Sequence, residues 1–579
     1  MKKMIVSRQA QIDSSELNAE NLIDRILLSR GIASKKELDY SLANLQPFTE
    51  LKDIDKACQL LAEAIEQQQK ILIVGDFDAD GATSSALGIL VLKAFGAKHI
   101  DYLVPNRFDY GYGLSPELVE LAKTQQPDLI VTVDNGISSI QGVHKAKEYG
   151  IKVVITDHHL AGDELPQADA IVNPNQPDDK FASKNLAGVG VMFYLLLALR
   201  SYLRDKNWFE QEKITEPNLS HYLDLVALGT VADLVALDYN NRILVHHGLR
   251  LMRAAKARPG ILQLLNLTKK NLAKVKSTDL GFAVGPRINA AGRLDDMSLG
   301  IECLLASDEK QAREYAQILH QLNSDRQQVE QEMQDEAMAI LAEQSFENFD
   351  ANSLCLYQAH WHQGVVGLLA SRIKEKVNRP CIVFANEDEK NLKGSARSVK
   401  ELHIRDALAL LDSQQPGLIT KFGGHAMAAG LSIKSEDFER FCQYFESVVT
   451  QLLQGDAIGN EIETDGSLSP EQLQLATIEQ LNVLAPFGQG FPEPIFSGEF
   501  EVLTQRIVGE NHLKLALKPP QDLNADDSEA VLQAIAFRVE VAQWQQKARK
   551  IRAVYQLDVN DYYQQPQLQL IIQYLERLD

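Results

Sequence analysis

Three aspartates recur at every second position, as Asp76, Asp78 and Asp80, and a glycine follows them. Alternate residues of an extended chain lie on the same side, so these carboxylates are expected to lie close together. Like charges at short range repel one another, and a hard divalent cation relieves that repulsion. The spacing therefore indicates a metal site, with a solvated acidic turn as the alternative that the motif alone leaves open.

A calcium-binding EF-hand loop opens with similar spacing, but its other requirements are not met here. Such a loop carries a bidentate Glu at its twelfth position, where this chain has Leu87. A helix precedes such a loop, whereas residues 71–74 are an apolar run typical of a strand buried on both faces. The sequence therefore disfavours an EF-hand.

Two more apolar runs, at 128–134 and 150–157, have the length and composition of buried strands. Stretches with helical periodicity separate the strand-like runs, for example 82–95, which ends at Gly96. Strands that alternate with helices predict βαβ units and a parallel sheet, so the expected fold class is α/β.

Aspartates and histidines stand where these apolar runs end. They are Asp134, Asp157 with His158 and His159 after it, and Asp233 at the end of a further apolar segment. The carboxyl ends of parallel strands meet at one edge of a sheet, where open α/β sheets bind ligands. Any one such Asp can instead cap a helix, but the repetition predicts convergence. Carboxylates and imidazoles without thiolates favour Mn²⁺ or Mg²⁺ over zinc.

Four short motifs carry a family resemblance. Asp-Phe-Asp-Ala-Asp-Gly, Val-Asp-Asn-Gly, Asp-His-His and Gly-Thr-Val-Ala-Asp occur in this order and resemble the signature motifs of the DHH phosphoesterase superfamily. Within it, the chain resembles the RecJ family of bacterial single-strand-specific 5′→3′ DNA exonucleases. The segments that match RecJ-like patterns are 104–107, 111–113, 285–293 and 423–430. The resemblance covers nearly the whole chain.

The resemblance implies a site for two Mn²⁺ or Mg²⁺ ions, which suits phosphodiester hydrolysis. The residues that it implies for the metal site are Asp76, Asp78, Asp80, Asp134, His158 and Asp233. Asp76 is either a direct ligand or a neighbour of one. Asp157 and His159 are implied catalytic residues that orient a ligand imidazole or handle a proton. A purely structural role is the alternative for His159.

A Gly-Pro-rich segment carries Arg287, Asn289 and Arg293, and we expect it to form a turn. Because guanidinium forks bind phosphate oxygens in a bidentate manner, this turn is a candidate phosphate clamp. Pairing of an arginine with Asp295 or Asp296 is the alternative. Nearer the N-terminus, Gly188 and Gly190 at the start of an apolar helix suggest close helix packing or, less readily, a phosphate cradle.

Strand-like runs at 354–357, 381–384 and 431–433 predict a second α/β domain, which resembles the DHH-associated domain. The resemblance implies that Ser395 and Arg397 receive a terminal 5′-phosphate. It also implies that His425 contacts the scissile phosphate and that Arg107 binds substrate. A packing or hydrogen-bonding role is the alternative for His425.

Between Gly300 and Gly364 the chain has no glycine, and apolar residues recur at near-helical spacing. We expect one long helix over 308–344, capped by Ser307 and about 55 Å long, as a strut between domains. Residues 455–465 are polar and contain a domain boundary.

Five short strand-like runs near the C-terminus fit the OB-like barrel that the resemblance implies. Such barrels bind single strands by stacking of bases on aromatic side chains over a basic groove. The candidate contacts are Phe487, Phe491, Arg506, His512 and Lys514. Phe487 and Phe491 are equally compatible with the core of the domain.

The expected architecture is a parallel-sheet DHH catalytic domain, a long connecting helix, a second α/β DHH-associated domain and a C-terminal OB-like β-barrel. The expected bounds are 1–50 for an N-terminal helical segment, 51–306 for the catalytic domain, 307–348 for the connecting helix, 349–455 for the DHH-associated substrate-binding domain and 456–579 for the OB-like nucleic-acid-binding domain.

Composition limits which cellular compartments and binding partners are compatible with the chain. A formal net charge of −21 argues against a general polyanion binder, so a nucleic-acid surface must be a local basic groove. The five scattered cysteines without a Cys-x-x-Cys pair fit free thiols in a reducing compartment. The N-terminus lacks a signal-peptide core, and the apolar run 186–199 is too short to span a bilayer. We therefore expect a cytoplasmic protein without a membrane partner.

The favoured function is a metal-dependent exonuclease that degrades single-stranded DNA 5′→3′ to mononucleotides in DNA repair and recombination. Metal dependence follows from the residues, whereas polarity and DNA preference follow from the resemblance. The alternatives are a phosphodiesterase for short oligonucleotides or cyclic dinucleotides, a pyrophosphatase, and a non-catalytic single-strand-binding scaffold. The expected partner is single-stranded DNA. The family's repair role makes a helicase and a single-strand-binding protein plausible additions, and a monomer is the default.

Overall fold

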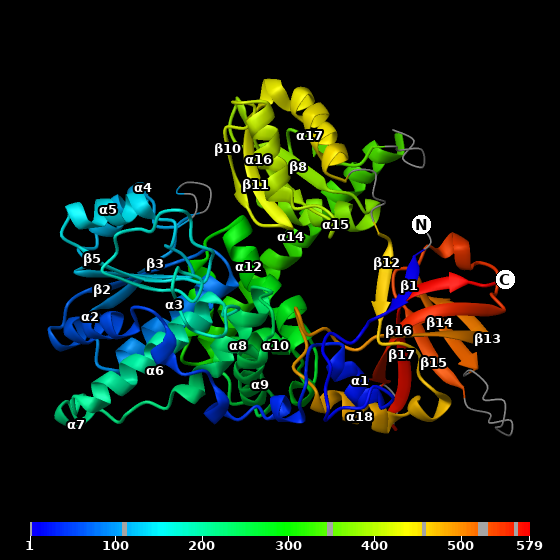
Figure 1. The fold of residues 1–579 in the computed structure, drawn as a ribbon, viewed down its shortest axis with the longest axis horizontal. Coiled ribbons are helices and arrows are strands. Elements are labelled where there is room, and N and C mark those ends of the chain that lie inside the picture. The colour runs from blue at the N-terminus through cyan, green and yellow to red at the C-terminus, as the bar shows by residue number, and fades with distance from the viewer. Residues whose placement is uncertain are drawn as a thin grey trace. The chain divides into compact units, whose positions relative to one another are not determined.

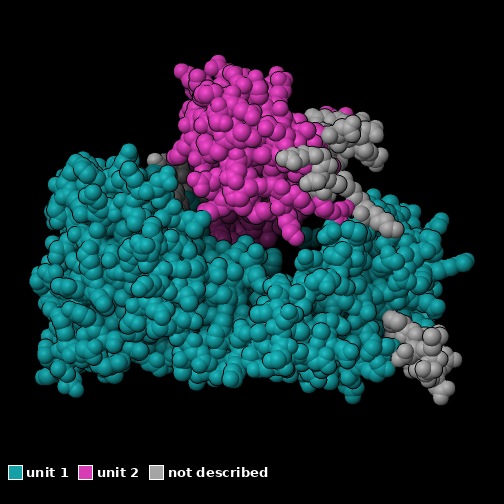
Figure 2. All heavy atoms as spheres, in the orientation of Figure 1, with its two compact units in different colours: residues 1–285, 304–307, 461–579 teal, residues 286–303, 308–460 magenta. Residues whose placement is uncertain are grey.

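The computed structural model describes residues 3–106, 110, 113–343, 351–453, 459–518, 531–560 and 565–579. The chain divides into two compact units (Figure 2). The first comprises Met1–Gly285, Leu304–Ser307 and Glu461–Asp579, and the second comprises Pro286–Cys303 and Asp308–Asn460. None of the helices in the described part is long and apolar enough to cross a membrane.

A five-stranded parallel sheet organises the N-terminal part of the first unit (Figure 1). Its order is β3-β2-β4-β5-β6, and every neighbouring pair is parallel. The strands are β2 (Ile71–Gly75), β3 (Ile100–Leu103), β4 (Leu129–Val133), β5 (Lys152–Thr156) and β6 (Ala170–Val172). All residues of β2 and β4 are buried, as their continuous apolar runs predict. The predicted parallel sheet is confirmed.

Helices cover both faces of this sheet (Figure 1). One face packs on α4 (Pro116–Lys123) and α5 (Ile140–Glu148) through Leu72, Val74 and Ile130. The other face carries α2 (Ile54–Glu66), α3 (Ala79–Ala94) and α6 (Gly188–Asp205). Because the chain leaves β2 for β3 on one side and returns to β4 on the other, the ends of β2 and β4 flank a topological switch point.

The rest of the regular structure in this α/β region is helical and includes 3-10 turns at Lys35–Leu38, Leu42–Asn44, Phe48–Glu50, Leu219–Tyr222 and Leu272–Lys274. The helices are α1 (Leu22–Leu28), α7 (Trp208–Gln211), α8 (Leu223–Ala232), α9 (Tyr239–Arg253), α10 (Pro259–Asn266) and α11 (Ser277–Asp279), followed by a π-helix at Leu280–Val284. The apolar segment that ends in Asp233 is therefore the helix α8, and its grouping with the strand-like runs was wrong.

A closed barrel in the order β13-β14-β15-β17-β16 forms the C-terminal part of the first unit. Its strands are β13 (Phe496–Val508), β14 (His512–Lys518), β15 (Leu532–Ala536), β16 (Lys550–Asn560) and β17 (Gln567–Arg577). The predicted five-stranded barrel is confirmed. Phe487 and Phe491, which precede it after α18 (Leu475–Val483), stack on each other and are buried. The core interpretation is therefore right for this pair.

The N-terminal residues pair with the segment that precedes the barrel, through a short sheet and a buried ion pair. Strand β1 (Met4–Ser7) pairs in parallel with β12 (Glu461–Thr464). Next to this pair, Arg30 Nη1 donates to Asp465 Oδ1 at 2.7 Å, and both side chains are almost fully buried. The expected N-terminal helical segment thus also contains a strand, which forms only beside its distant partner.

The second unit contains a mixed sheet in the order β10-β11-β9-β8-β7. Its strands are β7 (Leu354–Tyr357), β8 (Cys381–Asn386), β9 (Asn391–Arg397), β10 (Lys421–Gly424) and β11 (Ala428–Lys434). Its helices are α12 (Gly285–Leu294), α13 (Ser298–Leu305), α14 (Glu309–Glu343), α15 (Val366–Val377), α16 (Ile404–Gln414) and α17 (Phe438–Leu453). The predicted second α/β domain is confirmed.

The long predicted helix is α14, which has 35 residues. Its cap is Asp308 and not Ser307, because the Asp308 carboxylate accepts hydrogen bonds from the backbone N–H groups of Lys310 and Gln311. The predicted turn around Asn289 is instead the helix α12, so this expectation was wrong. Gly285 and Pro286 stand in its first turn, where a proline fits a helix well.

Candidate metal centre

The acidic motif after β2 turns directly into α3. The Asp78 carboxylate caps this helix by accepting hydrogen bonds from Asp80 N at 2.9 Å and Gly81 N at 3.1 Å. Asp80 lies within the first turn of the helix, so the expectation of an extended backbone through all three acids was wrong. The strand–helix turn, and not strand alternation, brings the carboxylates together.

Asp134 follows β4 with a positive φ of 63°, a backbone conformation that few residues other than Gly, Asn and Asp adopt readily. The next residue, Asn135, fixes this turn. Its side-chain amide donates to Val74 O at 3.1 Å and to Val133 O at 2.9 Å, which ties the ends of β2 and β4 together. Asp134 is only 2% exposed, so its carboxylate is held inside the molecule.

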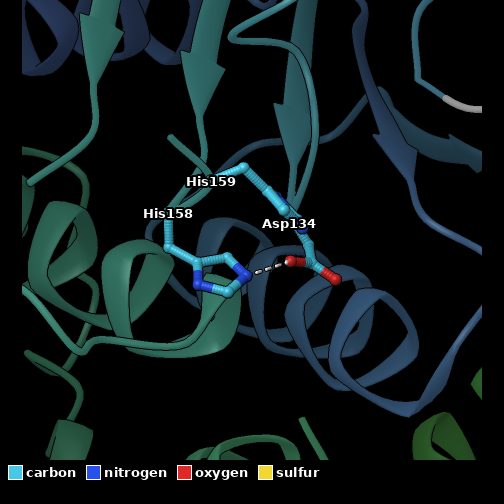
Figure 3. Close-up of side chains that lie close together, drawn as sticks. All are labelled: Asp134, His158 and His159. Atoms are coloured by element: carbon cyan, nitrogen blue, oxygen red, sulfur yellow. Dashed lines mark ion pairs between the residues drawn. The ribbon is translucent and has the colours of Figure 1, made fainter. Parts of the chain in front are cut away.

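The histidine pair follows β5. Figure 3 shows the His158 ring directed at Asp134, with His158 Nε2 at 3.2 Å from Asp134 Oδ1. The same nitrogen lies 3.4 Å from Asp233 Oδ2, at the C-terminal end of α8. His159 contacts Asp157 instead, through Nδ1 at 2.7 Å from Asp157 Oδ1. His158 thus lies between the carboxylates of Asp134 and Asp233, whereas His159 is held by Asp157.

Three groups of side chains place possible ligand atoms within 4.8 Å of one another. They are Asp76, Asp78 and Asp134; Asp80, His158 and Asp233; and Asp134, His158 and His159. All six residues predicted for the metal site therefore come together at the carboxyl edge of the sheet, from the ends of three strands, the start of α3 and the end of α8.

Two glycines allow the neighbouring helices to pack closely against these side chains. A Cβ on Gly188 would lie 2.5 Å from Asp134 Cβ, and a Cβ on Gly229 would lie 2.7 Å from Asp80 Oδ1. At the start of α6, the backbone N–H groups of Gly188 and Val189 donate to the Asp80 carboxylate at 2.6 and 3.0 Å. The start of α6 thus packs closely against its neighbours, which is the role that the sequence favoured for Gly188 and Gly190. The positive end of this helix also stabilises the Asp80 carboxylate.

Burial and mutual repulsion raise the pKa values of three acids in this cluster. Burial, followed by repulsion from Asp78, raises the pKa of Asp80 to about 7. Burial and the surrounding carboxylates, Asp80 first among them, also raise the pKa of Asp134 and of Asp233. When these buried carboxylates are charged, they repel one another strongly because little water screens them. The cluster therefore favours binding either protons or a cation.

The Asp157–His159 pair behaves in the opposite way. Burial opposes ionisation of Asp157, but its hydrogen bond with His159 and the backbone N–H of Ile137 outweigh it and lower the pKa. Burial disfavours the charged form of His159, yet the bond to Asp157 and the nearby acids raise the pKa of the imidazole. A charged carboxylate can only accept, so His159 Nδ1 is the donor in this contact.

Two asparagines that the sequence interpretation did not single out position the histidine loop. Asn175 Nδ2 donates to His158 O at 2.6 Å, and Asn173 Nδ2 donates to His159 O at 2.9 Å. Both follow β6, so they obey the same rule of polar residues after a strand that revealed the acids. The Asn-Pro-Asn sequence after the short apolar run was the available signal.

The donor set fits hard divalent cations. It offers buried carboxylate oxygens and imidazole nitrogens without a thiolate, which suits Mn²⁺ and Mg²⁺. The raised pKa values show that the acids are destabilised as anions when no cation is near. The residues therefore fit the metal site that the sequence predicts.

The remaining predicted site residues lie in the second unit, except Arg107, which falls outside the described residues. Arg397, at the end of β9, donates from Nη1 to Ser395 Oγ and from Nε to Ser371 Oγ, each at 3.1 Å. His425 is exposed in the turn between β10 and β11.

The other three residues, Arg287, Asn289 and Arg293, lie on α12. Arg293 Nη1 donates to the Gly364 carbonyl at 3.1 Å. This contact was neither of the two roles considered for the arginine from the sequence. A helix presents residues three or four positions apart on one face, so Asn289 and Arg293 are neighbours along α12.

Comparison with known proteins places the chain in a family. Profiles match residues 70–230 (DHH family, N-terminal domain), 350–451 (DHHA1 domain) and 464–574 (RecJ OB domain). The single-stranded-DNA-specific exonuclease RecJ of Escherichia coli is 49% identical over 578 residues, 99% of each chain. The chain belongs to the RecJ family.

Further relatives extend this result. The RecJ exonuclease of Bacillus subtilis is 32% identical, over 96% of this chain and 68% of its own length. Crystal structures of RecJ from Thermus thermophilus match this fold, with TM-scores of 0.78 for the Mn²⁺ complex and 0.73 for the Mg²⁺ complex. Their identities are 28% and 26%; both matches cover 98% of this chain, and 79% and 78% of those chains. The RecJ architecture of DHH, DHHA1 and OB domains is thus shared.

Proposed function

We propose that this protein is a metal-dependent exonuclease specific for single-stranded DNA, which degrades the strand 5′→3′ to mononucleotides. The observation that carries the proposal is the convergence of buried acids on His158, whose Nε2 lies 3.2 Å from Asp134 and 3.4 Å from Asp233. The names of the RecJ relatives supply the substrate class, and the solved RecJ complexes support Mn²⁺ or Mg²⁺ as the cofactor.

The residues that would hold two ions are Asp76, Asp78, Asp80, Asp134, His158 and Asp233, as the three ligand groups suggest. Bound there, a pair of ions supplies an activated water and neutralises the attacking and leaving oxygens of a phosphodiester. Asp134 and His158 each belong to two of the groups, so either residue would be able to serve either ligand set.

The chain's own acid–base pair is Asp157 and His159. Asp157 holds the ring of His159 through the 2.7 Å contact and favours its protonated form. His159 can therefore keep a proton near the scissile phosphate and deliver it to the leaving oxygen. The amides of Asn173 and Asn175 fix the backbone of both histidines, which limits their movement during turnover.

The 5′-end selectivity is assigned to residues of the DHH-associated domain. Ser395 and Arg397 lie against the start of α15, where a Cβ on Gly367 would lie 3.0 Å from Ser395 Oγ. Hydroxyl, guanidinium and helix N-terminus are a suitable set for a terminal phosphate. His425, together with Arg107, Arg287, Asn289 and Arg293, is assigned to contacts with the strand.

The wider setting forms part of the same proposal. A closed barrel of the RecJ OB type supports a polymer as the substrate, since such barrels bind single strands. A cytoplasmic location fits the five free cysteines. A role in repair and recombination, a monomeric state, cooperation with a helicase and a single-strand-binding protein, and the domain bounds given above complete the proposal.

The test is a digest of a 60-nucleotide single strand labelled at the 5′ or the 3′ end, with Mn²⁺ and with EDTA. We expect labelled mononucleotide to appear first from the 5′-labelled strand, only with metal, and not from a matched duplex. The Asp134→Asn variant is the inactive control. Release from the 3′ end first, or faster turnover of a dinucleotide than of the long strand, would refute the proposal.

A further inference from the structure

Phe282 is the most exposed large apolar side chain in the described part of the chain, at 83%. Its neighbours two positions away, Leu280 and Val284, are fully buried. Single exposed apolar residues are common on protein surfaces and need no explanation by themselves. Two independent features of its surroundings distinguish Phe282 from the others.

The first feature is the backbone. Phe282 is the middle residue of the π-helix Leu280–Val284, which separates α11 from α12. A π turn inserts an extra residue into a helix and is frequently found at functional sites. Leu280 and Val284, four positions apart, both face the core, while Phe282 between them projects into solvent.

The second feature is the position beside the metal centre, within the same compact unit. The π-helix packs on the last turn of α8, since a Cβ on Gly281 would lie 3.4 Å from Val231 Cγ1. A Cβ on Gly285 would lie 3.1 Å from Ala232 Cβ. Val231 and Ala232 directly precede Asp233, whose carboxylate contacts His158.

Leu234 is a second exposed apolar residue in this region, and it directly follows Asp233 at the end of α8. It is 66% exposed and has a positive φ of 61°, so the chain turns out of the helix at this point. Asp233 thus has an exposed apolar side chain as its next neighbour, and the helix that ends at it packs on the turn carrying Phe282.

We propose that Phe282 is a stacking platform for an unpaired nucleobase of the strand whose phosphate is held at the metal centre. The inference rests on the proposed function and deepens it. In a single strand the bases are the large apolar faces available to an aromatic ring, because sugar and phosphate are polar. In a duplex the same faces are stacked within the helix, so Phe282 contributes to the preference for single strands.

The direct test uses 2-aminopurine, whose fluorescence falls when it stacks. It is placed singly at each of the first six positions of a 5′-phosphorylated 12-nucleotide strand whose phosphorothioate linkages resist hydrolysis, and binding is measured with Mn²⁺. We expect the wild type to quench at one position and Phe282→Ala to lose that quench, whereas Phe282→Trp retains it. Quenching profiles that are identical for the wild type and Phe282→Ala would overturn the proposal.

A kinetic cycle adds a second readout with Mn²⁺. Phe282→Ala and Phe282→Leu are each expected to raise KM roughly tenfold on an intact strand, and Phe282→Trp to restore it. A single abasic site at the stacking position should raise KM for the wild type but not for Phe282→Ala. A defect of the same size on every abasic strand would instead show that Phe282 acts through packing or a protein partner, and would overturn the proposal.

The control is Val483→Ala, which truncates another exposed apolar side chain, 69% exposed on α18, and should leave KM unchanged. Thermal unfolding and Mn²⁺ titration of each variant should match the wild type. If the wild type hydrolyses no strand, the proposed function fails, whereas the 2-aminopurine profiles still decide whether Phe282 stacks on a base.

Discussion

The cluster around Asp80 and Asp134 shows a conflict between burial and charge that only a ligand resolves. Asp80 is 1% exposed and Asp134 is 2% exposed, although both are acids surrounded by other acids. A purely structural cluster of this kind would be replaced without loss by apolar residues, because buried like charges destabilise a fold. The arrangement is therefore explained by what it binds.

Asp80 gives the metal-free protein a defined pH dependence. Its folded-state pKa is raised to about 7 from an ordinary value near 4, so its contribution to stability is fully present below pH 4. That contribution is lost as pH rises through 7. In EDTA, the free energy of unfolding of the wild type minus that of Asp80→Asn should fall by a few kcal/mol between pH 4.5 and 8.

Urea unfolding of both proteins at several pH values measures this difference directly. With saturating Mn²⁺ the wild type should instead gain stability as pH rises, because metal and protons compete for the same oxygens. A difference that does not change with pH in EDTA would show that Asp80 ionises without penalty in the folded protein.

Residue type and spacing were sufficient to predict that the acids and the histidine pair lie close together, because the motifs that carry them follow apolar runs. The supporting contacts could not be found in this way. Gly229 is significant only because a Cβ there would approach Asp80, 149 residues earlier in the chain. Asn173 and Asn175 are significant only because their amides reach the carbonyls of the histidine pair. Such partners are determined by the folded chain and not by local pattern.

Elements position the site by their ends. Strand ends supply Asp76, Asp134 and Asp157, whereas the start of α6 holds Asp80 and the end of α8 supplies Asp233. The strands were predicted well, since continuous apolar runs bounded by polar residues are distinctive. The helix α8 was grouped with them because a fully buried helix is equally apolar, and periodicity then gives no signal.

The start of α6 has no space for a side chain on Gly188. A Cβ there would lie 2.5 Å from Asp134 Cβ and 2.8 Å from Asp134 Cα. We therefore expect Gly188→Ala to cost about 1–3 kcal/mol of stability and to weaken Mn²⁺ binding by displacing Asp134. Urea unfolding and calorimetric Mn²⁺ titration measure the two effects.

Gly162→Ala is the matched control, since Gly162 is exposed and a Cβ there would find its nearest neighbour at 3.9 Å. It should change neither measurement. If Gly188→Ala bound Mn²⁺ as tightly as the wild type, close packing at this helix start would have no role in the metal centre.

The start of α15 makes an equally specific prediction for the proposed phosphate pocket. A Cβ on Gly367 would lie 3.0 Å from Ser395 Oγ and 3.1 Å from Arg397 Nη2, in the space assigned to the phosphate. Gly367→Ala should therefore raise KM for a 5′-phosphorylated strand about tenfold and leave KM for a 5′-hydroxyl strand unchanged. Equal effects on both strands would place the terminal phosphate elsewhere.

In the first unit, contacts join parts of the chain that lie more than 400 residues apart. Arg30 and Asp465 pair 435 residues apart, beside the strands β1 and β12. Asp465 also accepts a hydrogen bond from Ile495 N at 3.0 Å, at the entrance to the barrel. Sequence patterns did not reveal this pairing, since neither residue stands in a motif and the partners are far apart.

Breaking the pair should destabilise the first unit strongly. Asp465→Asn leaves the Arg30 guanidinium buried and without a counter-charge, which should cost about 3–5 kcal/mol in the free energy of unfolding. Glu463→Gln, whose side chain is 51% exposed, is the control and should cost less than about 1 kcal/mol. Guanidinium unfolding compares them, and equal small losses would show that the pair is dispensable.

The metal centre is tested most directly by anomalous diffraction at the manganese edge from crystals of this protein grown with Mn²⁺. We expect two peaks at the carboxyl edge of the sheet, coordinated by side chains from the set Asp76, Asp78, Asp80, Asp134, His158 and Asp233. An empty edge at saturating Mn²⁺, or ions held by other side chains, would contradict it.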